Sequence, residues 1–241
     1  QSDHQFIPMD LVEAARHRHL NETQYSFAAK IIGVDRAWSG DDTIIFLRQG
    51  LMSKKLATFN KNEDDFIVAG HLARFEDQEK ADAVFIDFGY GTGLFSAGKQ
   101  MGRKWILVNF GSEPTDRKYL NKRIEMWGLM KEWLQGGGTI PNDQDLCSDL
   151  TAPEVFEVQT GSNAGRLQME SKDDMRARGV PSPDDADALA LTFAFPVKNK
   201  SQSQFDALTR NRREPYDILG NNTMAQQKAY DPLSPLSEVL K

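Results

Sequence analysis

The segment from Ser182 to Phe195 constrains the fold more than any other part of the sequence. It reads Ser-Pro-Asp-Asp-Ala-Asp-Ala-Leu-Ala-Leu-Thr-Phe-Ala-Phe. Ser182 is a favourable N-cap, Pro183 suits the first helical position, and the acids that follow suit the positive end of a helix. The rest of this helix is apolar on nearly every face, so we expect it to be buried between other elements of the fold.

Acidic side chains crowd the first turn of this predicted helix. Asp184 and Asp187 are three residues apart and share a face, whereas Asp185 points about a quarter-turn away. Two carboxylates on one face of a buried helix raise each other's pKa unless a cation lies between them. The segment alone does not choose between a metal site and a set of solvated acids that serve the helix N-terminus.

Two apolar runs that end in aspartate predict strands of a central sheet. One run covers 30–35 and ends at Asp35, and the other covers 82–87 and ends at Asp87. The first run is followed by two further apolar segments, which predicts an antiparallel meander, and the second by alternating strands and helices, which predicts parallel strands. The expected strands and helices after the first run are strands 43–48, 51–58, 82–87, 105–109, 154–158 and 166–170, and helices 64–79, 94–101, 116–134 and 172–178. The predicted fold class is therefore α/β, with a mixed central sheet flanked by helices.

The chain of 241 residues, with 39% hydrophobic and 27% charged residues, has the composition of a globular protein. A short amphipathic helix over 8–20 lies within a linker, 1–22, that docks on the main domain, 23–196. Residues 197–241 are polar, so we expect a tail that is partly disordered. The net charge of −6 argues against a general nucleic-acid coat but is compatible with a nuclease whose acids bind metal.

Other site types find little support. Cys147 is the only cysteine and the four histidines are scattered, which excludes an intrachain disulfide and a thiolate zinc cluster. The segment 93–100 fits the phosphate-loop pattern GxxxxGK, but Gln100 stands where a hydroxyl is needed for magnesium and the intervening residues predict a helix. We expect no ATPase site here, and no segment is long and apolar enough to span a membrane.

The acids at the two strand ends and at the helix start predict a metal centre when they are taken together. Adjacent strand ends and a helix N-terminus can bring Asp35, Asp87, Asp184 and Asp187 within a few ångströms of one another. Hard oxygen ligands favour Mg²⁺ or Mn²⁺, and two such ions about 4 Å apart suit phosphoryl transfer. For Asp41 and Asp42, a turn is the better interpretation.

An ordered set of motifs carries a family resemblance over roughly residues 5–196. The motifs are Phe6-Ile7-Pro8 with Glu13-Ala14-Ala15, Gly33-Val34-Asp35 followed by Gly40-Asp41-Asp42, the strand ending at Asp87 with Gly89 and Gly91, Lys172-Asp173-Asp174-Met175-Arg176-Ala177-Arg178-Gly179, and Ser182-Pro183-Asp184 with Asp187-Ala188-Leu189. With these motifs the chain resembles the C-terminal nuclease domain of a tailed-bacteriophage terminase large subunit, a member of the RNase H-like (retroviral-integrase-like) superfamily.

The resemblance implies both a site and a function. Asp35, Asp87 and Asp184 would be the catalytic carboxylates and Asp187 a fourth metal ligand, while Asp185 could replace Asp184 or Asp187. The activity would be metal-dependent endonuclease cleavage of concatemeric double-stranded viral DNA during genome packaging, with two Mg²⁺ or Mn²⁺ ions. The expected partners are double-stranded DNA, the portal protein, the small terminase subunit and an N-terminal ATPase domain of the same polypeptide. The expected location is the host cell cytoplasm, at the viral procapsid portal.

DNA would be contacted mainly through its phosphates. Arg36 adjoins the first acid, and segment 101–133 has an excess of basic side chains that either faces DNA or forms a solvated helix face. The candidate DNA-binding residues are Arg36, Arg103, Lys104, Lys122 and Arg123. Two other classes stay open: another RNase H-like nuclease, such as a junction resolvase or recombinase, and a non-catalytic DNA clamp or portal-docking module.

Overall fold

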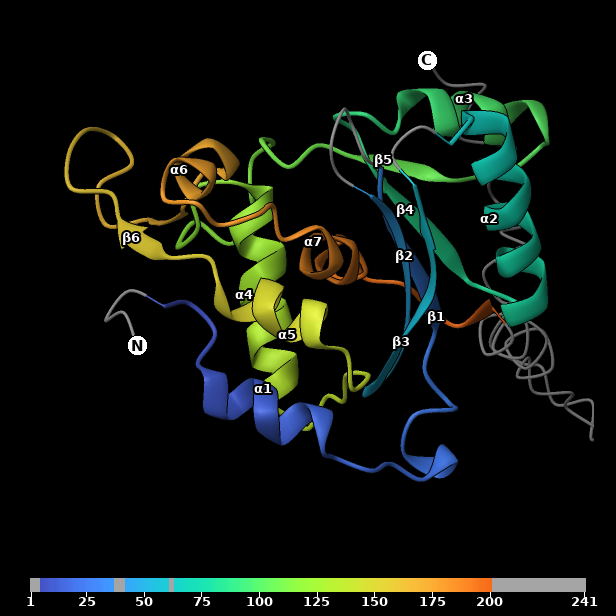
Figure 1. Ribbon diagram of the computed structural model, residues 1–241, viewed down its shortest axis with the longest axis horizontal. Helices are drawn as coiled ribbons and strands as arrows, with labels where there is room; N and C mark the ends of the chain where they lie inside the picture. Colours follow the sequence, from blue (N-terminus) through green and yellow to red (C-terminus); the bar gives the residue numbers. More distant parts are fainter. Residues whose placement is uncertain (1–4, 37–41, 61–62, 201–241) are drawn as a thin grey trace, which may run out of the picture. The chain divides into compact units, whose positions relative to one another are not determined.

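A five-stranded mixed sheet forms the centre of the computed structural model, which describes residues 5–36, 42–60 and 63–200 (Figure 1). The strand order is β3-β2-β1-β4-β5. β1 is antiparallel to β2 and parallel to β4, so the predicted meander and parallel strands meet at β1. The strands of this sheet are β1 (Lys30–Asp35), β2 (Thr43–Gln49), β3 (Met52–Phe59), β4 (Ala83–Asp87) and β5 (Ile106–Val108), and a separate hairpin comprises β6 (Val155–Glu157) and β7 (Leu167–Met169).

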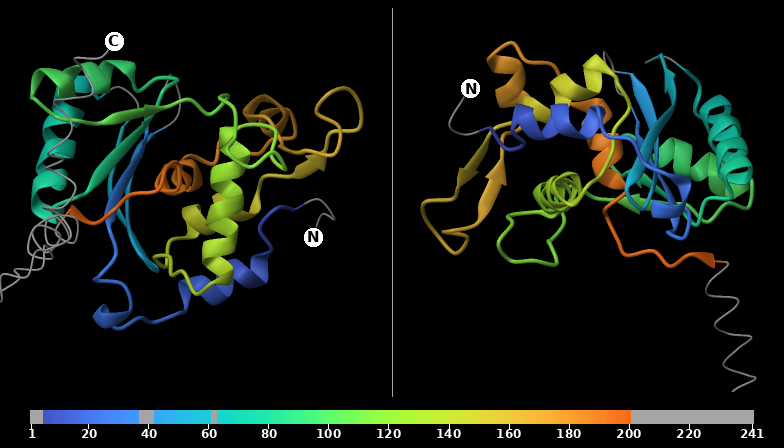
Figure 2. Two further views of the ribbon diagram at one scale, coloured as in Figure 1. Left: turned by 180° about the vertical axis from the view of Figure 1, so that it is seen from behind. Right: turned by 90° about the horizontal axis from the view of Figure 1, so that it is seen from below.

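Helices cover both faces of the sheet, as Figures 1 and 2 show. α2 and α3 lie on one face, and α7 lies on the other, with α4, α5 and α1 beyond it. The helices are α1 (Met9–Arg16), α2 (Asp65–Glu79), α3 (Thr92–Gln100), α4 (Lys122–Gln135), α5 (Gln144–Thr151), α6 (Lys172–Ala177) and α7 (Asp184–Leu191), with a short 3-10 turn at Glu22–Gln24. None of the helices in the described ranges is long and apolar enough to cross a membrane.

The alternation of side chains along β1 divides the core into two layers. Ile32 and Val34 pack with α2 and α3, whereas Ile31 packs with α4 and α7 on the opposite face. Successive residues of a strand point to opposite faces, so Asp35 must point to the same face as Ile31. The same reasoning places Asp87 with Phe85, which belongs to the core layer beneath α7.

α7 lies directly against β1, and Gly33 permits this contact. A Cβ atom at position 33 would lie 2.1 Å from the carbonyl oxygen of Ala188, which is too close for any other residue type. The residues from Ala186 to Leu191 are all buried, as the apolar pattern of this helix predicts. The helix that begins with the acids is therefore held against the strand that ends in Asp35.

Several predicted boundaries need correction. α7 begins at Asp184 with Pro183 at the N-cap, one residue later than expected. α4 begins at Lys122 instead of 116, because residues 118–120 extend along β7: Leu167 N–H donates to the carbonyl of Lys118, and Leu120 N–H donates to that of Leu167. The Asn121 side chain then caps the helix.

The helix of the predicted linker and the start of the predicted tail also differ from expectation. The first helix ends at Arg16 instead of 20, and Arg18 instead donates to the carbonyls of Leu134 and Gly138 near the end of α4. Lys200 N–H donates to Asp82, so the chain still contacts the folded core beyond the expected boundary at 196. The remainder of the predicted tail, 201–241, lies outside the described residues, as do Gly40 and Asp41.

Candidate metal centre

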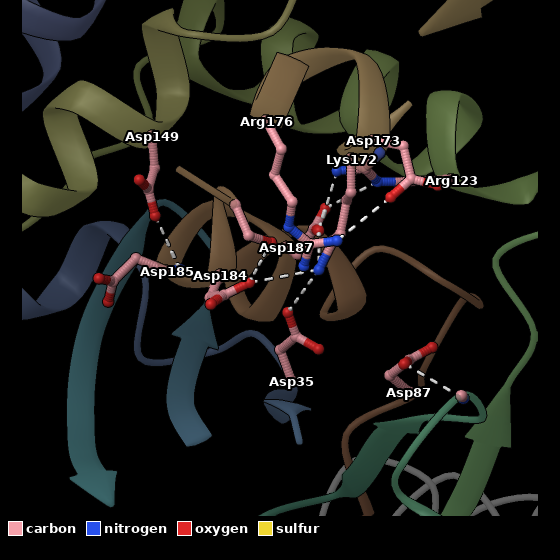
Figure 3. A network of polar contacts seen from close by, with 12 residues as sticks. Asp35, Asp87, Arg123, Asp149, Lys172, Asp173, Arg176, Asp184, Asp185 and Asp187 are labelled. Carbon is pink, nitrogen blue, oxygen red and sulfur yellow. Dashed lines mark hydrogen bonds and ion pairs between the residues drawn. The ribbon is translucent and has the colours of Figure 1, made fainter. Parts of the chain in front are cut away.

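Four elements bring acidic and basic side chains together at one edge of the sheet (Figure 3). β1 ends in Asp35, β4 ends in Asp87, α7 begins with Asp184, and the short helix α6 begins with Lys172. Because β1 and β4 are parallel neighbours, their carboxyl ends lie at the same edge. Asp35 is buried, with 5% of its surface exposed.

The ammonium group of Lys172 lies at the centre of this cluster. Its Nζ is 3.2 Å from Asp184 Oδ1, 3.2 Å from Asp187 Oδ2 and 3.5 Å from Asp35 Oδ2. The shared contact confirms that Asp184 and Asp187 occupy one face of the helix. Burial opposes the charge on Lys172, but the surrounding carboxylates outweigh it and raise the pKa of the ammonium.

Asp35 carries an unfavourable charge in this setting. Burial raises the pKa of Asp35 well above its usual value; Lys172 lowers it, but Asp187, Asp184 and Asp87 raise it again. The pKa of Asp87 is raised too, chiefly by burial, although the backbone N–H of Gly89 donates to its Oδ2 at 3.1 Å. One ammonium therefore does not neutralise the negative charge that collects here.

Asp187 differs from the other acids because both of its oxygens already have strong donors. The guanidinium of Arg123 donates to Oδ1 at 3.1 Å and to Oδ2 at 3.0 Å, and Trp127 Nε1 donates to Oδ1 at 2.8 Å. The side chain is completely buried. Burial would raise the pKa of Asp187, but Arg123 and Lys172 outweigh that effect and hold it below its usual value. Asp187 is therefore an ionised carboxylate whose negative charge is balanced by Arg123 and Lys172.

Asp185 points away from the cluster, as its position on the helix predicts. Its Oδ1 lies 2.6 Å from Lys55 Nζ on β3, and its backbone N–H donates to Asp149 Oδ2 at 2.9 Å. Figure 3 shows Asp149 and Asp185 on the side of Asp184 that faces away from Lys172. Burial, together with the charge of Asp185, raises the pKa of Asp149 to about 8.

The donor chemistry of the cluster fits a divalent cation of the magnesium type. Carboxylate oxygens are the ligands that Mg²⁺ and Mn²⁺ prefer. Asp35 and Asp184 already share one cationic partner in Lys172, which marks the point between them as one that attracts positive charge. As the side chains lie in the described part of the chain, no group of three or more histidine, cysteine or acidic residues is spaced to hold a metal ion. The place between Asp35 and Asp184 is taken by the Lys172 ammonium.

Most of the predicted DNA-binding side chains are engaged within the fold. Arg36 is buried and donates to Asp65 Oδ1 at 2.8 Å, to Thr43 Oγ1 at 2.8 Å and to the carbonyl of Glu63 at 2.7 Å. Lys122 is also buried and lies 2.6 Å from Glu125. Contact between DNA and either side chain would require these bonds to break.

The other three predicted contacts have different surroundings. Arg123 holds Asp187, as described above, and Arg103 forms two hydrogen bonds with Asp77, at 2.6 and 2.7 Å. Lys104 is exposed. In segment 101–133, some basic side chains therefore form buried ion pairs, such as those of Lys122 and Arg123, whereas others, such as Lys104, lie at the surface.

Sequence reasoning missed three residues that shape this centre. Lys172 belongs to the motif that carries the family resemblance, and its position just before the acidic helix could have suggested a counter-ion. Trp127 and Asp149 give no such signal, because each reaches α7 from a helix distant in sequence. Asp149 looks like an ordinary acid of an amphipathic helix.

The strand order and the placing of the acids define the class of fold. A mixed sheet in the order 3-2-1-4-5 with helices on both faces is an RNase H-like fold, and in this chain the acids lie at the ends of β1 and β4 and at the start of a helix packed on β1. No known protein-family model matches the chain, and no curated protein sequence matches it.

Solved structures with a similar fold include nuclease domains of phage large terminase subunits. The domain from bacterial virus Sf6, in a lysine-to-alanine variant solved with manganese, has a TM-score of 0.65 at 19% identity, over 79% of this chain and 99% of that one. The domain from thermophilic phage G20c with bound magnesium has a TM-score of 0.56 at 16% identity, over 80% and 98%. The large terminase of bacteriophage HK97 has a TM-score of 0.56 at 10% identity, over 79% of this chain and 43% of that one.

Proposed function

We propose that this chain is the nuclease domain of a phage large terminase subunit and that it cleaves double-stranded DNA with the help of divalent metal ions. The observation that carries the proposal is the cluster of Asp35, Asp184 and Lys172, with Asp87 at the neighbouring strand end. The same fold occurs in terminase nuclease domains that were solved with manganese or magnesium.

Asp35, Asp87 and Asp184 are the residues that we assign to the metal ions. When bound, two Mg²⁺ or Mn²⁺ ions would lower the pKa of an attacking water and stabilise the leaving oxygen of a phosphodiester. Asp35 is the central ligand in this assignment, because it is buried beside Asp187, Asp184 and Asp87, all of which raise its pKa. Asp187 is the fourth ligand of the sequence-based prediction, but its four donors support a second role as the anion that holds Arg123 and Lys172 in place.

Lys172 has a defined part in this scheme. It balances the acids as they lie here, and its ammonium would leave the place between Asp35 and Asp184 if a metal ion bound there. A flexible side chain of this length can then turn toward a DNA phosphate at the same edge of the sheet. Arg176 of the same helix pairs with the exposed Asp173 at 3.2 Å (Figure 3).

The partners and setting that we propose follow from the same resemblance. They are double-stranded DNA, the portal protein, the small terminase subunit and an ATPase domain of the same polypeptide, acting at the procapsid portal in the host cytoplasm. DNA contact would be largely independent of sequence because phosphates are the main targets. Within the predicted contact set, Lys104 is the exposed lysine.

Plasmid cleavage with Mn²⁺, Mg²⁺ or EDTA tests the proposal. We expect nicking and linearisation with Mn²⁺ or Mg²⁺, no cleavage with EDTA, and loss of cleavage in Asp35→Ala and Asp184→Ala. Asp173→Ala is the matched control, because this acid of α6 is 92% exposed and pairs only with Arg176 among the contacts described. Metal-independent DNA binding without cleavage would support the clamp instead, and a preference for branched DNA would support a resolvase.

A further inference from the structure

The start of α7 lacks a side-chain cap of its own. Pro183 occupies the N-cap position and makes no side-chain hydrogen bond to the helix. The first N–H groups of a helix have no partner within the helix, and a side-chain oxygen at the N-cap usually accepts from one of them. The helix that carries Asp184 therefore depends on another part of the protein for this acceptor.

Asp149 of α5 supplies the missing acceptor. Its Oδ2 accepts from the backbone N–H of Asp185 at 2.9 Å, across 36 residues of sequence. Asp149 is only partly exposed, and α5 packs against α7. A carboxyl group from a neighbouring helix thus takes the place of the N-cap of α7.

Lys55 closes a ring of contacts around this point. Its ammonium lies 2.6 Å from Asp185 Oδ1 and 2.5 Å from Asp143 Oδ2. Asp143 is itself the N-cap of α5, where its Oδ1 accepts from the N–H groups of Asp145 and Leu146. The start of α7 is thereby tied to the start of α5 through Lys55 and to the later part of α5 through Asp149.

We propose that Asp149, Asp185 and Lys55 are positioning residues that hold the first turn of α7 so that Asp184 faces the metal centre. Asp185 is then a tether and not a metal ligand: its side chain is directed to Lys55 while Asp184, the preceding residue, is directed to Lys172. This inference rests on the proposed function for its consequence at the metal centre. The cap on the Asp185 amide, which is the structural part of the inference, does not depend on the proposed function.

The first arm of the test measures amide hydrogen exchange by NMR in the wild type, Asp149→Ala and Asp149→Asn. Asparagine keeps a side-chain carbonyl that can accept from the Asp185 N–H, and alanine does not. We expect exchange of the Asp185 amide to be faster in Asp149→Ala and to return toward the wild-type rate in Asp149→Asn. An unchanged exchange rate in Asp149→Ala would overturn the cap, whatever the protein does with metal.

The second arm measures Mn²⁺ binding by calorimetry in the same proteins, with no DNA present. Loss of groups that orient metal ligands typically weakens metal affinity or activity about 10–100-fold. We therefore expect the Mn²⁺ dissociation constant of Asp149→Ala to be larger by about that factor. Asp149→Asn should bind Mn²⁺ nearly as tightly as the wild type. Equal binding by the wild type and Asp149→Ala would overturn the positioning role alone. Failure of the wild type to bind Mn²⁺ would overturn the proposed metal centre and the positioning role with it.

Lys55→Met and Lys54→Met form a matched pair for the tether. Lys54 is the neighbouring residue on β3 and lies 2.8 Å from Glu79, on the other side of the sheet from α7. We expect Lys55→Met to weaken Mn²⁺ binding and Lys54→Met to leave it unchanged. A merely structural role for Lys55 would lower the melting temperature of Lys55→Met without changing its Mn²⁺ affinity, and that result would contradict the proposal.

Discussion

Three aspartates in one turn of α7 have three different environments. Asp184 faces Lys172 and the end of β1, Asp185 faces Lys55, and Asp187 is completely buried against Arg123 and Trp127. The pKa values of these acids shift in different directions. Burial would raise the pKa of Asp187, but Arg123 and Lys172 outweigh it and lower the pKa. The pKa of Asp185 is raised, chiefly by burial. Identical side chains therefore take on different roles within four residues.

At the residue scale, the Arg123–Asp187 pair should be essential for folding stability. Replacing Arg123 with Met leaves the Asp187 carboxylate buried without its main counter-ion, which typically costs about 3–5 kcal/mol in the free energy of unfolding. Urea denaturation, monitored by tryptophan fluorescence, measures this loss. Arg103→Met is the control, since Arg103 pairs with an exposed Asp77 and its removal should change stability little. Equal losses in the two variants would contradict this account.

At the scale of elements, the contact between α7 and β1 decides where the acids meet. The buried helix could lie on the sheet only where the strand presents no side chain, and Gly33 provides that place two residues before Asp35. Strand alternation then directs Asp35 toward the start of α7. The separation between α7 and β1 thus sets the distance between Asp35 and Asp184.

Gly33→Ala should disturb this contact. The new methyl group would lie 2.1 Å from the backbone oxygen of Ala188, so α7 must shift; overpacking of this kind costs about 1–3 kcal/mol in stability. The matched control is Gly70→Ala on α2, where an added Cβ meets nothing within 4 Å. That change should stabilise the protein by about 0.5–1 kcal/mol because alanine favours a helix. Thermal denaturation of both variants tests whether Gly33→Ala lowers the stability of the protein and Gly70→Ala raises it.

At the scale of the whole molecule, the proposed metal centre connects segments that are far apart in sequence. β1, β4, α6 and α7 all contribute, so the site exists only in the folded chain. A ligand that binds only the folded state stabilises it by mass action. Metal binding should therefore stabilise the main domain as a unit.

Mn²⁺ should raise the melting temperature, and EDTA should reverse the effect. At 100 times its dissociation constant, a bound ion contributes about 2.7 kcal/mol, which corresponds to roughly 5–10 °C for a domain of this size. Differential scanning fluorimetry measures the shift. Asp35→Asn should abolish it and Asp173→Asn should keep it, because Asp173 lies outside the cluster. A shift of the same size in Asp35→Asn would exclude Asp35 as a ligand.

Much of the fold could be predicted because it depends on local periodicity. Apolar runs that end in Asp35 and Asp87 form neighbouring parallel strands, and the apolar helix from Asp184 to Leu191 is buried. The spacing of Asp184 and Asp187 correctly predicted a shared face, since a helix has a fixed number of residues per turn. These features require only the order of residues within one element.

Tertiary structure alone decided which partner each charge receives. Lys172 lies between Asp35 and Asp184, Arg123 is buried against Asp187, and α4 begins six residues later than predicted because 118–120 extends along β7. The sequence by itself determined the strands, the buried helix and the faces on which the acids lie, because regular backbone geometry specifies them. Pairing between charges depends on distances across elements that are up to 137 residues apart in the chain, and only packing sets those distances.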